Sequence, residues 1–140
     1  MKKALIYFLL TLPLIFTGQS LSASKLLQYG NLQNSSIITK ELQQLGFQTK
    51  TDSSEGYPIY HFTKKTSRGL ERIEMGNNSE LFMFIYKSES AVYEILKSKI
   101  LTSDFKYSYS YKNAKYYENE KMRIGTDDKN GIISIFKPLK

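Results

Sequence analysis

The feature that most constrains the fold is a pattern that occurs twice, at residues 71–87 and again at residues 120–137. In each copy a glutamate and a cation precede residues that alternate between apolar and polar as far as a glycine, Gly76 or Gly125. A polar turn follows, and then an apolar run that ends in an aromatic residue and a lysine. Alternation on both sides of a turn is typical of a β-hairpin. The chain is therefore expected to use one kind of hairpin twice.

The sequence leaves open whether the two hairpins are a true duplication. The copies agree up to the glycine, and the second turn is then one residue longer than the first. A helical segment and a further strand precede each copy, which favours a repeat, but two unrelated amphipathic hairpins would explain so short a match equally well. A true repeat predicts buried residues, and a glycine at the strand end, in equivalent places: Ile73, Met75 and Gly76 in one copy, Met122, Ile124 and Gly125 in the other.

Two helices are predicted, one ahead of each group of strands. The first spans residues 34–45, because Asn34 suits an N-cap and Gly46 suits the left-handed position that ends a helix. The second begins near Ser88, also a good N-cap, and ends around Ser103. The apolar residues of each helix recur at helical spacing. These stripes are Ile38, Leu42 and Leu45 in the first helix, and Val92, Ile95, Leu96 and Ile100 in the second.

The remaining segments are assigned from turn residues and alternation. Within residues 24–32 only a short helical turn through Leu26 and Leu27 is expected, because Gly30 and Asn31 break it. Residues 48–56 are polar and predict a turn. Strands are predicted at residues 57–65 and 105–112 in addition to those of the two hairpins, and the first strand of the second hairpin is expected to be long, over residues 115–125. The apolar run at residues 81–86 should be a central strand, since both of its faces need cover.

The resulting order is α-βββ-α-βββ. It predicts a single pseudo-duplicated α+β domain with an antiparallel sheet and two helices on one face. In architecture alone, a tandem of a helix and a meander resembles secreted proteinaceous inhibitors such as the β-lactamase inhibitory proteins. The repeats of that family have an additional helix and strand. The resemblance implies a protein that binds another protein, and it places no individual residue.

The N-terminus has the organisation of a secretory signal peptide. Two lysines form a positive n-region, residues 4–16 form an apolar h-region, and residues 17–23 form a small and polar c-region. We therefore expect residues 1–23 to be cleaved and residues 24–140 to fold as one domain. The protein is expected to be exported, to the periplasm or the medium, with no transmembrane segment after cleavage.

Composition narrows the class of partner. The net charge of +7 becomes +5 once the two lysines of the n-region are removed. A mild basic excess suits acidic proteins or anionic envelope polymers, and it also serves solubility. Export argues against nucleic acid as a partner. The sequence contains no cysteine, so the domain must fold without disulfides.

The residues offer little for catalysis. His61 is the only histidine, which argues against a zinc site and leaves any catalytic triad dependent on a histidine between two aromatic residues. Residues 127–131 lack the ligand spacing of a calcium loop and predict a turn. Four glutamates are expected to point outward and form cross-strand ion pairs: Glu71, Glu74, Glu118 and Glu120. We predict no cofactor, no metal and no enzymatic activity.

Tyrosine is the feature that stands out from the background. Eleven tyrosines and no tryptophan occur, and nine of the eleven lie between Tyr57 and Tyr117. Tyrosine combines a rigid ring with a hydroxyl group, and it is enriched at binding surfaces. The candidate binding residues form a tyrosine ladder bordered by cations: Tyr107, Tyr109, Tyr111, Lys112, Lys115 and Arg123.

A structural role for this ladder competes with a binding role. Residues 105–112 alternate, which puts the aromatic residues on one face and the lysines and serines on the other. We expect the aromatic face to pack under the helices, because their apolar stripes need an apolar sheet face. The solvated face would then carry Lys106, Ser108, Ser110 and Lys112.

Three functions are compatible with these expectations. The leading prediction is an exported, non-enzymatic module that binds a protein partner, as an inhibitor or immunity-type protein does. The second is a binder of anionic glycans or lipid headgroups that uses tyrosine and lysine. The third and weakest is an envelope hydrolase.

Overall fold

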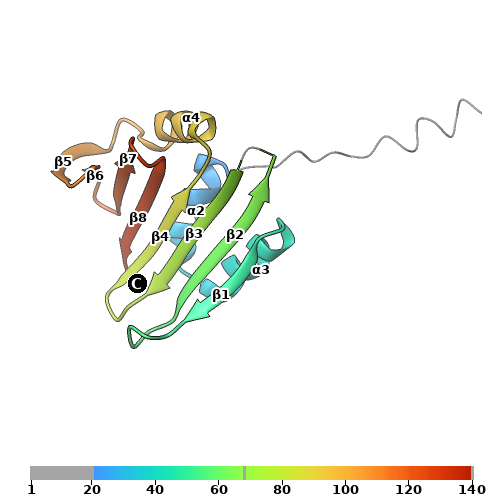
Figure 1. Cartoon of the computed structure of the whole chain (residues 1–140). Coiled ribbons are helices and arrows are strands. Elements are labelled where there is room, and N and C mark those ends of the chain that lie inside the picture. Colours follow the sequence, from blue (N-terminus) through green and yellow to red (C-terminus); the bar gives the residue numbers. More distant parts are fainter. Residues whose placement is uncertain (1–20, 68, 140) are drawn as a thin grey trace, which may run out of the picture.

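A computed structural model describes residues 21–67 and 69–139 (Figure 1). It shows an α+β fold with three helices and one antiparallel sheet of eight strands. The helices are α2 (Ala23–Leu32), α3 (Ser35–Gln44) and α4 (Ser90–Ile100). The strands are β1 (Gln48–Asp52), β2 (Ile59–Thr66), β3 (Gly69–Asn77), β4 (Leu81–Lys87), β5 (Lys106–Tyr111), β6 (Ala114–Glu118), β7 (Arg123–Asp127) and β8 (Ile132–Pro138). The predicted signal peptide lies outside the described residues, apart from its last three positions.

The sheet consists of two meanders that meet in the middle. Its strand order is β1-β2-β3-β4-β8-β7-β6-β5, so β4 and β8 form the central pair, with Phe84 opposite Ile135. The prediction that residues 81–86 form a central strand is confirmed. Helices α2 and α3 lie behind β2, β3 and β4 in Figure 1. The core forms between the helices and this face of the sheet.

Helix α2 is longer than the sequence predicted. Ser22 caps it by accepting a hydrogen bond from the amide of Lys25 at 3.2 Å. Gly30 does not end the helix but lies inside it, where a Cβ atom would stand 3.0 Å from Cγ2 of Ile135 in β8. The glycine therefore serves the close approach of α2 to the central strands, and this tertiary contact outweighs its poor helix propensity.

Helix α3 forms as predicted from its ends. The Asn34 side chain accepts from the amide of Ile37 at 3.1 Å. At the other end Gly46 adopts φ +93°, and the amide of Phe47 donates to the carbonyl of Leu42 at 3.0 Å. Such a left-handed residue with a backward hydrogen bond is a common way to end a helix.

Helix α4 differs from the prediction at its start and in its buried face. Its N-cap is Glu89 and not Ser88, and the Glu89 side chain makes no capping hydrogen bond. The buried stripe is Tyr93, Leu96 and Ile100, whereas Ile95 is exposed. The stripe therefore runs through a tyrosine, because its ring fills the core while its hydroxyl reaches the edge.

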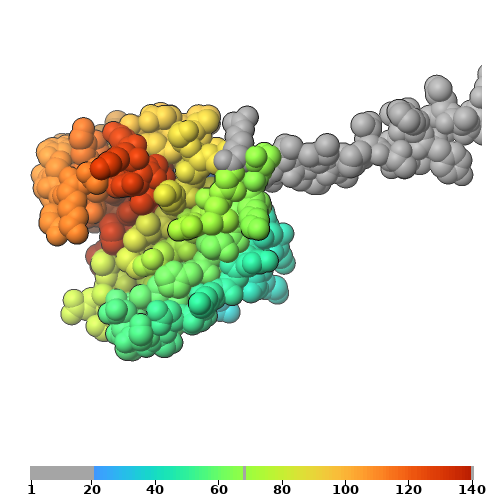
Figure 2. All heavy atoms as spheres, viewed as in Figure 1, coloured from blue at the N-terminus to red at the C-terminus, as the bar shows by residue number. Residues whose placement is uncertain are grey.

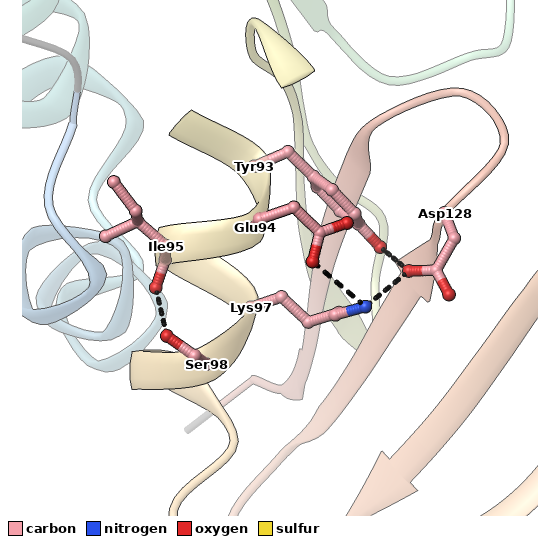
Figure 3. Close-up of polar contacts among 6 residues, drawn as sticks. All are labelled: Tyr93, Glu94, Ile95, Lys97, Ser98 and Asp128. Atoms are coloured by element: carbon pink, nitrogen blue, oxygen red, sulfur yellow. Dashed lines mark hydrogen bonds and ion pairs between the residues drawn. The ribbon is translucent and has the colours of Figure 1, made fainter. Parts of the chain in front are cut away.

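A polar cluster attaches α4 to the turn between β7 and β8 (Figure 3). The Tyr93 hydroxyl donates to Oδ1 of Asp128 at 2.6 Å, and Lys97 Nζ donates to the same oxygen at 2.8 Å. Glu94 lies 3.5 Å from Lys97 Nζ. Hydrogen bonds from Lys97 and Tyr93 lower the pKa of Asp128, whereas burial and the hydrogen bond to Asp128 raise the pKa of Tyr93.

Two strand assignments were wrong. Residues 48–52 form edge strand β1 where a turn was expected, because pairing with β2 supplies the order that local propensity lacks. Residues 115–125 are not one long strand but β6 and β7 joined by a tight turn. The Asn119 side chain shapes this turn by accepting from the amides of Lys121 and Met122 at 2.8 and 2.9 Å.

The duplication is not confirmed. The predicted residues of both hairpins are buried, but Met75 pairs with Phe84 and Ile124 pairs with Ile135. The second hairpin is thus longer by two residues between equivalent pairs, and not by one. The aromatic residues that end the two hairpins therefore lie on opposite faces of the sheet, because a register shift of one residue moves a side chain from one face to the other. Gly125 also lies in the middle of β7, not at its end.

Candidate functional site

One face of the sheet is left without helices among the described residues, and we call it the open face. Figure 1 is viewed from this side, and in Figure 2 the strands hide α2 almost completely. Alternate residues of the central strands point to this side and are only half-buried. They form an apolar band, which consists of Leu81, Met83, Ile85, Ile132 and Phe136.

The prediction that the tyrosine ladder packs under the helices was wrong. Every residue of edge strand β5 is exposed, and no helix lies over it within the described chain. The exposed fractions are 58% for Tyr107, 39% for Tyr109 and 60% for Tyr111. The helices lie nearest β1, β4 and β8 instead, and buried Phe and Ile side chains of β2, β3, β4 and β8 supply the apolar sheet face.

A β-bulge also divides the ladder between two faces. Tyr107 pairs with Tyr117, but Tyr109 pairs with Tyr116, so the register shifts between them. A bulge of this kind adds one residue to a strand and breaks its strict alternation. Tyr109 therefore lies on the open face, and Tyr107 points to the other side, where its hydroxyl lies 2.9 Å from Oγ of Ser110. Alternation read from the sequence alone gave no sign of this bulge.

The open-face tyrosines form a built cluster. The rings of Tyr109 and Tyr116 stack with centroids 4.8 Å apart and an interplanar angle of 19°. The Arg123 guanidinium lies 5.3 Å from the Tyr109 centroid, and its Nε donates to Glu118 at 2.5 Å. Phe136 lies beside Tyr116, with centroids 6.3 Å apart. We call these five residues the tyrosine–arginine cluster.

Gly125 explains how the cluster is held. It pairs with Tyr116, and a Cβ atom built on it would lie 2.9 Å from Cε1 of that ring. Only glycine lets the ring lie flat against β7 in this way. Burial, ahead of the neighbouring charges, raises the pKa of Tyr116. The stack therefore rests on the sheet and presents its upper ring to solvent.

The cluster adjoins both the apolar band and a shallow surface pocket. Phe136 belongs to the cluster and the band, since it pairs with Arg123 on one side and with Met83 on the other. The pocket lies at the same end of the sheet and is lined by Leu81, Met122, Arg123, Phe136 and Pro138, together with residues 118–121. Charge, aromatic rings and apolar side chains thus form one continuous surface.

The structure separates the six candidate binding residues into two groups. Tyr109, Tyr111 and Arg123 share the open face, and Lys112 in the β5–β6 turn lies 5.3 Å above the Tyr111 ring. Tyr107 and Lys115 lie on the other side, since Lys115 pairs with Thr126, a residue buried on the helix side. The sequence predicted these six residues as one group, but the structure places them on opposite faces of the sheet.

The predicted outward position of the glutamates was wrong for Glu71. Its side chain is 1% exposed and accepts a hydrogen bond from the Tyr86 hydroxyl at 2.7 Å. The alternation that buries Ile73 and Met75 also buries Glu71, because the three share one face of β3. Glu74 does lie on the open face, with one carboxylate oxygen 3.9 Å from Nδ1 of His61.

The described residues include no group of three or more histidine, cysteine or acidic side chains that could hold a metal ion. Residues 127–131 form a turn, as predicted. Asp127 shapes it by accepting from the backbone amide and side chain of Asn130 at 3.0 and 2.8 Å. Its carboxylate is therefore engaged by the turn itself.

No family model, curated protein or solved structure matches this chain. Among residues 21–67 and 69–139, no helix has the length and apolar character needed to cross a membrane.

Proposed function

We propose that this protein is a non-enzymatic binding module that holds a protein partner on the open face of its sheet. The observation that carries the proposal is the unequal cover of the central strands. Strand β4 is apolar on both sides, but helices cover only one of them within the described chain. The other side keeps a half-buried apolar band that continues into the tyrosine–arginine cluster.

This composition resembles that of a protein interface. Interfaces combine an apolar centre with a polar rim and are enriched in tyrosine and arginine. Here the band supplies the centre. Polar and charged residues of β2, β3 and β4 border it: His61, Arg72, Glu74 and Lys87. Export to the periplasm or the medium, inferred from residues 1–23, forms part of the same proposal.

A second candidate, a binder of anionic glycans or lipid headgroups, is favoured by one observation. Two cations stand over exposed tyrosine rings, Arg123 over Tyr109 and Lys112 over Tyr111. Such pairs offer a flat ring for a sugar and a charge for an anion. The apolar band has no role in this reading, so a protein partner accounts for more of the surface.

The experiment compares capture of exported proteins from the source organism by the parent and by two matched double variants. The first, Tyr109→Ser with Arg123→Gln, alters the open face. The second, Tyr107→Ser with Lys115→Gln, likewise removes one tyrosine and one cation, but on the opposite face of the same half of the sheet. We expect the first variant to bind the captured partner at least about tenfold more weakly than the parent does, as when an interface anchor is removed. The second variant should retain this partner.

Salt dependence then distinguishes the two candidate functions. An anionic polymer should be released steeply as ionic strength rises, whereas an interface anchored by tyrosine and apolar side chains should weaken little. Equal loss of capture in both double variants, or loss in the opposite-side variant alone, would contradict a site on the open face.

A further inference from the structure

We infer that the outer edge of β5 binds an acidic strand of the partner, which extends the sheet by antiparallel or parallel pairing. This inference rests on the proposed protein-binding function and identifies part of the partner's chemistry. It begins from the position of β5 at the end of the sheet. No strand of the described chain pairs with its outer edge, so backbone amides and carbonyls face solvent there. Such a row of groups is a template for another strand.

The two edges of the sheet are not equivalent. Strand β1 carries Lys50 and Asp52 in its five residues, and the Gln43 side chain of α3 donates to Thr49 at 3.3 Å. Charged residues and short length are the usual means by which proteins discourage pairing at an edge. Strand β5 carries a charge only at its first residue, Lys106, and its other residues are tyrosine and serine. Figure 2 shows this hairpin, in orange, at the rim of the molecule.

The charge around β5 selects the occupant. Residues 106–116 include three lysines and no acidic residue. The nearest glutamate along the hairpin, Glu118, is already held by Arg123 at 2.5 Å and by the Ser108 hydroxyl at 3.2 Å. An incoming strand with carboxylates on the open-face side would lie beside Lys106, which belongs to β5 itself, and opposite charges on neighbouring strands stabilise their pairing.

The same charges disfavour a second copy of this chain as the occupant. Two β5 strands that pair antiparallel about their centres would bring Lys106 of one copy near Lys112 of the other at both ends. Like charges placed across a strand pair are destabilising. On the far side, Tyr107 stacks edge-on against Tyr117 with centroids 5.9 Å apart.

The test uses short synthetic peptides as probes of the full exported chain. The first alternates glutamate with valine, the second replaces each glutamate with lysine, and the third repeats the first with every backbone amide N-methylated, so that neither edge of the peptide can donate. We expect the first peptide to bind at least about tenfold more tightly than the second. It should also slow hydrogen exchange at the β5 amides, and N-methylation should abolish this protection because it removes backbone donors.

Three results would overturn strand addition. One is equal binding of the acidic and basic peptides, another is binding that leaves the exchange of β5 amides unchanged, and the third is protection of those amides by self-association without peptide. Each leaves the proposed function standing if the open-face double variant still loses its partner selectively. If instead the two double variants do not differ in capture while the acidic peptide still pairs with β5, the open face is not the binding site and only the edge of β5 remains as one.

Discussion

The two halves of the sheet are both four-stranded antiparallel meanders, but they are covered differently. In the half formed by β1–β4, helix α3 packs at β1 and α2 packs at β4. In the half formed by β8–β5, helices α2 and α4 reach β8, whereas β5 stands exposed along its whole length. The position of the helices, not the pattern of the strands, therefore decides which residues become core and which become surface.

Tyrosine shows the consequence most clearly. The same residue type fills the core where a helix covers it and forms an open surface where none does. Three tyrosines are 1–2% exposed in the covered region, Tyr29, Tyr86 and Tyr93. The three tyrosines of β5 are exposed and lie where a partner can reach them. The tyrosine–arginine cluster thus lies in the half of the sheet whose side chains contribute least to the core.

The largest expected effect is a difference in the free energy of unfolding between substitutions in the two halves of the sheet. Met75 in β3 is fully buried, so Met75→Ala should lower the free energy of unfolding by about 2–5 kcal/mol. Tyr111 in β5 is mostly exposed, so Tyr111→Ala should change it by less than about 1 kcal/mol. Urea denaturation of both variants measures the difference. Comparable losses would show that β5 belongs to the cooperative core.

The second effect concerns α2, which contacts the central strands of both halves. Leu21 is buried, and Ser22 caps the helix. A chain that begins at Ser24 loses both, and it should be less stable than one that begins at residue 20 by roughly 2–4 kcal/mol. Ser22→Ala in the longer chain removes the cap alone and should cost about 1 kcal/mol.

Thermal unfolding of the three chains measures this series. N-terminal sequencing of the protein isolated from its source organism then shows which start the organism uses. Equal stability of the two chain lengths would mean that Leu21 and the cap contribute nothing to the stability of the region where the two halves of the sheet meet.

The third effect tests the glycines that occupy similar places in the two hairpins. Gly125→Ala would place a Cβ 2.9 Å from the Tyr116 ring, and overpacking of this kind costs about 1–3 kcal/mol. At Gly76 the nearest atom to such a Cβ is 3.6 Å away, so Gly76→Ala should be neutral or slightly stabilising. A change in tyrosine fluorescence confined to Gly125→Ala would confirm displacement of the stack. Similar behaviour of the two variants would contradict the packing described for Tyr116.

The sequence predicted the elements that local signals define. Helix α3 follows from Asn34 and Gly46, and the central position of β4 follows from its apolar residues on both faces. The turn at residues 127–131 follows from its Asn-Gly dipeptide. In each case the signal lies within a few residues of the structure that it specifies, so no tertiary information was needed.

Several of the errors depend on distant contacts. Gly30 lies within a helix because of Ile135, and β1 is ordered because β2 pairs with it. The bulge at Tyr109 follows from pairing with β6, and it places Tyr107 on the opposite face from Tyr109 and Tyr111. Sequence reasoning identified the tyrosines and cations of the site, but their exposure depends on where the helices lie, which no local pattern records.

The fourth effect is small in stability and large in binding. Tyr109→Ser removes the upper ring of the stack with Tyr116, which is worth about 0.5–1.5 kcal/mol. Its melting temperature should therefore fall by only a few degrees, while partner capture falls at least about tenfold. Tyr107→Ser on the same strand is the control and should retain the partner. A large drop in melting temperature for Tyr109→Ser would return the ladder to a structural role.

The smallest effect concerns the ion pair that joins α4 to the second half of the sheet. Hydrogen bonds from Lys97 and Tyr93 hold the pKa of Asp128 below its ordinary value. A carboxylate with a lowered pKa stabilises the folded state above the pKa of the unfolded chain, about 3.9, and this contribution is lost as the pH falls through the folded-state pKa.

Asp128→Asn removes the charge and keeps an acceptor for the tyrosine. Since more than half of this side chain is exposed, solvent screens the pair, and the variant should lose no more than about 1 kcal/mol at pH 7. The difference from the parent should shrink at high salt and fade below about pH 4. Chemical denaturation at neutral and acidic pH measures it. A loss that persists unchanged in acid would assign the attachment of α4 to the hydrogen bonds and apolar contacts of Tyr93 and not to charge.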